Sequence, residues 1–144
     1  DTVTTLAGNS SGTYLSTTGF NDGTGTEAFM KYAFGLTIDN DGNLYVAETS
    51  NFKIRKITPA GVVTTIAGSG VASSLNANGT SATFNSPSNI VINPATGIGY
   101  VSEYTGDRIR KIELSGYDLP ASPALPNGLL FNKTTGKISE QTIN

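Results

Sequence analysis

The chain has 144 residues, enough for one ordinary domain, with a formal net charge of -2 and only 14% charged residues. This charge argues against electrostatic binding of nucleic acid, and no apolar run approaches the roughly 18 residues of a membrane span. Cysteine and histidine are absent, which excludes disulfides, Ser-His-Asp triads, Cys-His pairs and His-ligated zinc. We therefore expect no catalytic residues, no metal and no cofactor.

The N-terminal sequence VTTLAG, Val3–Gly8, is predicted to be a short β-branched strand closed by glycine. It returns as VTTIAG at Val63–Gly68, with five of six residues identical. A long segment rich in small residues, 9–32, follows the first copy. Its counterpart after the second copy, about 69–87, is shorter, because the repeat spacing falls from 60 at Val3 and Val63 to 54 at Leu36 and Ile90. We therefore expect both segments to be loops.

The longest internal repeat lies at the centre of the chain. LYVAETSNFKIRKI, Leu44–Ile57, returns 55 residues later as GYVSEYTGDRIRKI, Gly99–Ile112, with seven of fourteen positions identical. Each copy has an apolar run, a polar break and a second β-like run, which predicts a hairpin. With the flanking runs, the first unit should have strands near 34–38, 43–48, 52–58 and 62–67. Such a repeated four-stranded antiparallel unit predicts an all-β fold made of β-propeller blades.

The repeated residues also resemble a known family. The run YVAETSNFKIRKITPAGVVTTIAG is similar to the NHL repeat, and the resemblance covers about residues 3–116. The departures are Glu48 and Glu103, where aspartate is usual, and Phe52 and Asp107, where histidine often stands. The resemblance implies two NHL-type propeller blades from a bacterial protein that is secreted or held at the cell surface.

The composition changes after Gly116, which predicts a domain boundary between 1–116 and 117–144. The C-terminal segment, with the run PALPNGLLFNKTTGKIS, resembles the start of an immunoglobulin-like module of bacterial surface proteins. Its 28 residues are too few for such a sandwich, which needs about 100.

Two blades are too few for a closed propeller, which typically has about 4 to 8. One strand is spare at the start, and the second unit meets Pro120 before a full fourth strand is evident. One hypothesis is that the N-terminal strand completes the second blade of a neighbouring copy and so builds a homo-oligomeric ring or filament. The alternative is a fragment of a longer single-chain propeller. The assembly strand would comprise Val3, Thr4, Thr5, Leu6 and Ala7.

Three patterns could carry chemistry, and each has a structural alternative. The run DNDGN, Asp39–Asn43, could begin a calcium loop, but a turn between strands favours the same residues. Glu48 and Glu103 could be a glycosidase pair, but cross-strand ion pairing with the nearby arginines explains them more simply. The IRK triplets could bind RNA, but we expect Arg55 and its counterpart to be buried, their heads bound to carbonyls or carboxylates.

The long loops and the hairpin tips should emerge on one face of the propeller. Exposed aromatic side chains among Asn, Asp and Thr suit recognition of a protein or a glycan. We therefore predict a non-catalytic recognition or adhesion module, with a self-assembling structural subunit as the alternative. Phe29, Tyr32 and Phe34 could instead fill gaps between blades. The predicted ligand-binding residues are Tyr14, Phe20, Asn51, Phe52, Tyr104 and Asp107.

Overall fold

The computed structural model describes residues 1–9, 21–114, 129–132 and 137–140, and this part of the chain is all-β, with antiparallel sheets and no α-helix. The first sheet has five strands in the order β1-β5-β4-β3-β2. Its four long strands lie close to the predicted bounds. The strands are β1 (Gly23–Thr24), β2 (Ala33–Ile38), β3 (Leu44–Glu48), β4 (Lys53–Ile57) and β5 (Val62–Ala67).

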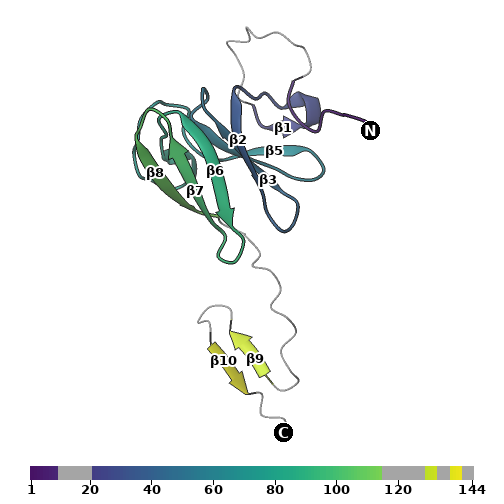
Figure 1. The fold of residues 1–144 in the computed structure, drawn as a ribbon, viewed down its shortest axis with the longest axis vertical. Helices are drawn as coiled ribbons and strands as arrows, with labels where there is room; N and C mark the ends of the chain where they lie inside the picture. The colour runs from purple at the N-terminus through teal and green to yellow at the C-terminus, as the bar shows by residue number, and fades with distance from the viewer. Residues whose placement is uncertain (10–20, 115–128, 133–136, 141–144) are drawn as a thin grey trace.

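The second sheet has three strands in the order β6-β7-β8 (Figure 1). They are β6 (Pro87–Asn93), β7 (Ile98–Glu103) and β8 (Arg108–Glu113). A separate two-stranded sheet joins β9 (Leu129–Asn132) to β10 (Lys137–Glu140), and the remainder of the predicted immunoglobulin-like segment lies outside the described residues. Two short 3-10 helices, η1 (Gly25–Glu27) and η2 (Gly79–Ser81), precede β2 and β6, and no described helix is long and apolar enough to cross a membrane.

Each sheet has two faces, because side chains alternate along a strand. We define the front face by Tyr45, Ala47 and Ile54 in the first sheet and by their counterparts Tyr100, Ser102 and Ile109 in the second. The back face is the other side, and the strand registers align its residues across each sheet. The back-face residues are Leu36, Val46 and Arg55 in the first sheet, and Ile90, Val101 and Arg110 in the second.

The front face of the first sheet packs against the back face of the second. The core between them contains Ile54 and Ala47 from the first sheet and Val101 from the second, all fully buried, and β6 lies against β2 and β3 (Figure 1). A smaller cluster on the back face of the first sheet joins Val63 to Ala28, Val46 and Ile57. The two units therefore stack head to tail, not as mirror images.

Gly35 permits the closest approach between the sheets. A Cβ atom at this position would collide with the backbone of Asn89 and would lie 2.7 Å from the carbonyl oxygen of Ser88. Glycine is needed here because it lacks a side chain, so β2 can lie directly against β6.

The N-terminal segment forms no strand within the single chain, and its predicted pairing with a neighbouring copy stays a prediction. Val3–Ala7 pairs with no described strand of this chain, and Val3 is 96% exposed. The physical reason is that a strand needs a hydrogen-bonding neighbour, and β5, which has nearly the same sequence, already occupies the matching edge of β4. Only the end of the segment is attached, because the Gly8 amide donates to the carbonyl of Gly25 at 3.1 Å.

Candidate functional site

A buried arginine organises the first unit. The Nη1 atom of Arg55 donates to Glu48 Oε2 at 2.9 Å and to the Phe29 carbonyl at 3.2 Å. Its Nη2 atom donates to the Asn21 carbonyl and to Asp22 Oδ1, both at 3.0 Å. The side chains of Arg55 and Glu48 are both fully buried, so this ion pair lies inside the protein and not at its surface.

The second unit repeats the same arrangement. The Nη1 atom of Arg110 donates to Glu103 Oε1 and to the Thr83 carbonyl, both at 2.9 Å. Its Nη2 atom donates to the Leu75 carbonyl at 3.0 Å and to Asn76 Oδ1 at 2.8 Å. The expectation that both arginine heads are buried on carbonyls and carboxylates is confirmed.

These contacts fix the segments that were predicted to be long loops. The carboxylates complete the attachment, since Glu48 accepts from the Lys31 amide and Glu103 from the Asn85 amide, each at 2.9 Å. The ranges 21–32 and 75–86 are therefore attached to the sheets of the first and second units by these hydrogen bonds. Sequence reasoning missed this, although Gly25-Thr26 and Gly79-Thr80 repeat at a spacing of 54 and could have indicated it.

The run Asp39–Asn43 is a turn closed by its own hydrogen bonds. The Asp39 carboxylate accepts from the Asn43 amide at 2.8 Å, the Asp41 amide at 3.0 Å and the Tyr45 hydroxyl at 3.1 Å. Burial by itself raises the pKa of Asp39, but hydrogen bonds from Asn43, Tyr45 and Asp41 outweigh it and hold the pKa below its ordinary value. These bonds give the side chain a structural role in the β2–β3 turn, with Gly42 at a φ of 81°.

The predicted ligand-binding residues differ in exposure. Tyr104 is 77% exposed and Asp107 is exposed beside it, whereas Phe52 is half-buried. Asn51 is a correction, because it is buried and donates to Glu48 Oε2 at 3.1 Å, which makes it part of the arginine cluster. Tyr14 and Phe20 lie outside the described residues.

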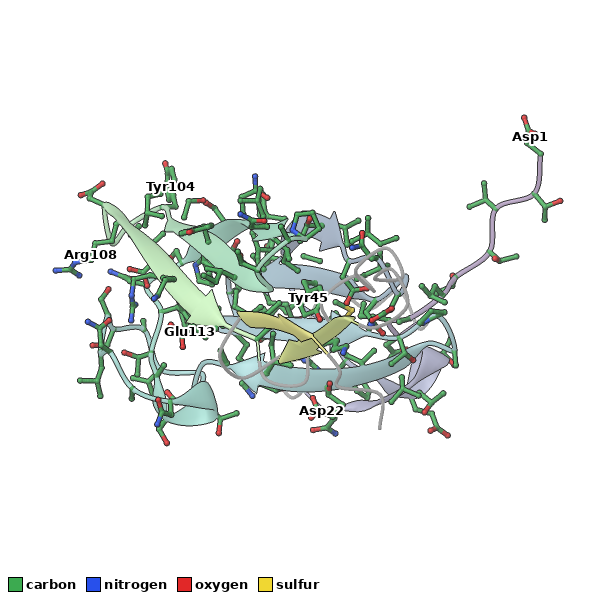
Figure 2. The ribbon with its side chains drawn as sticks, turned by 90° about the horizontal axis from the view of Figure 1, so that it is seen from below. Asp1, Asp22, Tyr45, Tyr104, Arg108 and Glu113 are labelled. Atoms are coloured by element: carbon green, nitrogen blue, oxygen red, sulfur yellow. The ribbon has the colours of Figure 1, made fainter. Side chains whose placement is uncertain are left out.

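The turn that carries Tyr104 is held firmly. The Tyr104 amide donates to the Ser86 carbonyl at 2.9 Å. The Thr105 hydroxyl lies 2.9 Å from both Asn85 Oδ1 and Ser86 Oγ, and the Asn85 side chain donates to the Thr105 carbonyl at 3.3 Å. Figure 2 shows Tyr104 and Arg108 at one end of the molecule, where both project outward. We name Tyr104, Asp107 and Arg108 the tip surface.

The gap-filling interpretation of the aromatic residues is wrong for two of them within this chain. Tyr32 is 43% exposed and Phe34 is 69% exposed, while Phe29 is half-buried. Phe34 belongs to a row of exposed apolar side chains on β2 that also includes Leu36 and Ile38, at 59% and 61%. This part of the back face is uncovered because the second sheet packs against the opposite, front face of the first sheet.

A groove runs along the free edge of β8. It has a volume of about 1020 Å³ and lies between this edge, the segment around η2 and the end of β5. In the first unit the corresponding edge of β4 is occupied by β5, but β8 has no fourth strand among the described residues. We name this feature the open-edge groove, and its lining includes Asn76, Ala82, Arg110, Lys111 and Ile112.

Comparison with known proteins gives partial matches. No family model matches the sequence. The chain is 32% identical over 98 residues to the chloroplastic protein Suppressor of Quenching 1 of Arabidopsis thaliana, which is 67% of this chain but only 9% of that protein.

Solved structures give matches of similar extent. A structural genomics protein of unknown function from Bacteroides thetaiotaomicron matches 74% of this chain with a TM-score of 0.63 and 31% identity. An auxiliary nutrient binding protein from Bacteroides ovatus matches 67% with a TM-score of 0.59 and 26% identity. This chain spans about a quarter of each, since both matches cover 26% of the solved chain.

Proposed function

We propose that this chain is a non-catalytic binding module that recognises a glycan or a protein through the tip surface. The observation that carries the proposal is Tyr104, an aromatic side chain that is 77% exposed on a turn held by several hydrogen bonds. A rigid, exposed aromatic ring offers contact area at little cost in conformational entropy. Asp107 and Arg108 beside it supply polar contacts that could orient a ligand.

The fold and the solved relatives support this reading. The two stacked sheets are interpreted as two propeller blades of the NHL type, with turns that present side chains from a stable scaffold. Two of the similar solved structures are auxiliary nutrient binding proteins of Bacteroides species, which is consistent with a binding role. We further propose a bacterial protein that acts outside the cell or at its surface.

Binding to an immobilised array of oligosaccharides and bacterial surface proteins would test this function. We expect the unaltered chain to bind at least one component of the array, the Tyr104→Ala variant to lose this binding and the Tyr100→Ala variant to keep it. Tyr100 is a suitable control because it is also an exposed tyrosine of the second sheet but lies on the front face. An equal loss in both variants, or no signal with the unaltered chain, would contradict binding through the tip surface.

A second candidate function is self-assembly into a structural ring or filament. It is favoured by the open-edge groove and by the exposed apolar rows on the two outer sheet faces, because uncovered strand edges and sheet faces promote association. The contact would be head to tail, since a groove on one unit and a strand on another are different surfaces.

A further inference from the structure

We infer that the open-edge groove is a strand-binding site whose occupant is residues Val3–Gly8 of a second copy of this chain. The inference rests on the assembly function proposed above and names the site and its partner. The first unit provides the precedent, because the same kind of groove is filled there by β5. The occupying sequence VTTIAG differs from the N-terminal VTTLAG at one position.

The groove has the groups that hold β5 in the first unit. There, Val63 is 1% exposed and packs against Ala28 and Ile57. The counterparts of these two residues, Ala82 and Ile112, line the open-edge groove. An incoming Val3 would bury its side chain against them, which is favourable because it removes apolar surface from water.

The polar contacts also correspond. Thr65 of β5 donates its hydroxyl to Asp22 Oδ1 at 2.8 Å, and the same carboxylate binds Arg55. In the second unit, Asn76 Oδ1 already accepts from Arg110, and Asn76 lines the groove. The hydroxyl of an incoming Thr5 would therefore find an oxygen acceptor in the equivalent place.

The N-terminal segment is positioned to be donated. The Gly8 amide binds the Gly25 carbonyl just as the Gly68 amide, at the end of β5, binds the Gly79 carbonyl at 3.2 Å. Gly68 joins the fourth strand of the first unit, β5, to the second unit. Gly8 makes the same contact with the first unit, so the segment before Gly8 lies where a fourth strand from a preceding unit would lie. Its backbone is available for pairing because Val3–Ala7 forms no strand.

Among the residues of this sequence, the N-terminal segment of a second copy is the best occupant of the groove. Figure 2 shows Asp1 and Arg108 at opposite ends of the molecule, and Figure 1 likewise separates the N-terminus from β8. The stretch of this chain that corresponds to β5 at a spacing of 55 is YDLPAS, 117–122, in which Pro120 stands at the position of Thr65. Proline has no N–H to donate to a strand ladder and has a low preference for strands, so this stretch is a poorer occupant than VTTLAG.

The exposed sheet faces support the same contact. Donation of the strand would place the back face of the first sheet, with Leu36 and Ile38, against the front face of the partner's second sheet. On that front face, Ile109 is 71% exposed and Val91 is 54% exposed. Gly35 would again lie opposite Asn89, but with exchanged roles, because Asn89 is the repeat counterpart of Gly35 and would here be the residue that approaches the partner's backbone. The contact between copies would therefore join the same two kinds of sheet face as the contact between the two units.

The register gives a sharp test. Thr64 of β5 lies opposite Lys56. Thr4 is the repeat counterpart of Thr64, and Lys111 is that of Lys56, so Thr4 of one copy should lie opposite Lys111 of the other. Opposed residues on antiparallel strands have Cα atoms about 4.5–5.5 Å apart, which suits a disulfide. The chain has no cysteine, so mixing Thr4→Cys and Lys111→Cys chains with oxidised glutathione gives an unambiguous crosslink. The control mixes Thr4→Cys with Lys56→Cys, whose neighbouring edge is filled by β5.

In the test mixture we expect a disulfide-linked peptide that joins positions 4 and 111, detected by mass spectrometry. In the control mixture we expect no corresponding peptide that joins positions 4 and 56. Equal crosslinking in both mixtures, or none in either, overturns the inference. Light scattering on the unaltered chain at the same concentration measures whether copies assemble at all, and the crosslink measures whether they do so through the open-edge groove. Oligomers without the 4–111 crosslink would mean that copies assemble through another surface. A single-chain mass with no crosslink would contradict both the strand-binding site and assembly as a function.

Discussion

At the scale of single residues, the stability of each unit depends on one buried guanidinium. Arg55 makes four hydrogen bonds to backbone and side-chain oxygens, and its Nε atom is buried without a partner among the described residues. A buried charge is costly unless it is paired, so the Glu48 carboxylate is essential to the arrangement. The pair therefore fixes how the preceding segment lies on the sheet.

Glu48→Gln should lower the free energy of unfolding by about 3–5 kcal/mol, because it leaves a buried guanidinium without its inner carboxylate. Urea unfolding followed by circular dichroism would measure this loss. Glu113→Gln is the matched control, since its ion pair with Lys111 is exposed and solvent screening should leave little effect. Equal unfolding midpoints for the two variants would contradict a stabilising role of the buried pair.

Asp39 should make stability depend on pH. Its folded-state pKa is lowered, because hydrogen bonds outweigh burial, so its contribution is present above the unfolded value of about 4 and is lost as the pH falls through the folded value. Asp39→Asn should therefore be less stable than the unaltered chain at neutral pH, and the difference should shrink toward about pH 2. Urea unfolding at both pH values measures it. Asp41→Asn, an exposed change in the same turn, should leave the pH dependence intact.

At the scale of elements, equivalent strands of the two units have unequal surroundings. Ile54 on β4 is fully buried, whereas Ile109 at the same place on β8 is 71% exposed. Ile90 on β6 is 1% exposed, whereas its counterpart Leu36 on β2 is 59% exposed. The cause is the head-to-tail stacking, which covers the front face of one sheet and the back face of the other and leaves the opposite faces open.

Ile54→Ala should cost about 2–5 kcal/mol of unfolding free energy, because it leaves a cavity between the sheets. Ile109→Ala should cost less than about 0.5 kcal/mol in dilute solution, because the side chain there is exposed. Thermal or urea unfolding of both variants provides the comparison. A similar loss in both would mean that the front face of the second sheet is also covered in solution.

At the scale of the whole molecule, the two units form an unclosed stack. One end has an unpaired strand sequence and an open back face, and the other has an open front face and the open-edge groove. Because the two ends differ, any contact between them is heterologous, and it produces a ring where the rotation closes or a filament where it does not. Binding through the tip surface is compatible with either form, since Tyr104 belongs to a turn at the end of the strands.

The sequence alone determined the strands, the hairpins and the repeat, because alternation, turn residues and identity at fixed spacing are local properties. It also indicated the Glu48–Arg55 and Glu103–Arg110 pairs, since cross-strand neighbours follow from the hairpin register. The burial of Asn51, the attachment of the predicted loops to the arginines, and the exposure of Phe34 could not be predicted in this way.

Those features depend on which surfaces meet. Asn51 reaches Glu48 only because the turn folds back onto the arginine cluster, and Phe34 is exposed only because the second sheet covers the other face of the first. The sequences Val3–Gly8 and Val63–Gly68, which differ at one position, make the point most clearly. Only the second forms a strand, because the edge of β4 lies beside it, whereas no strand edge lies beside the first within the described part of the chain. Local sequence sets what a segment is able to form, and tertiary packing decides which segments find a partner.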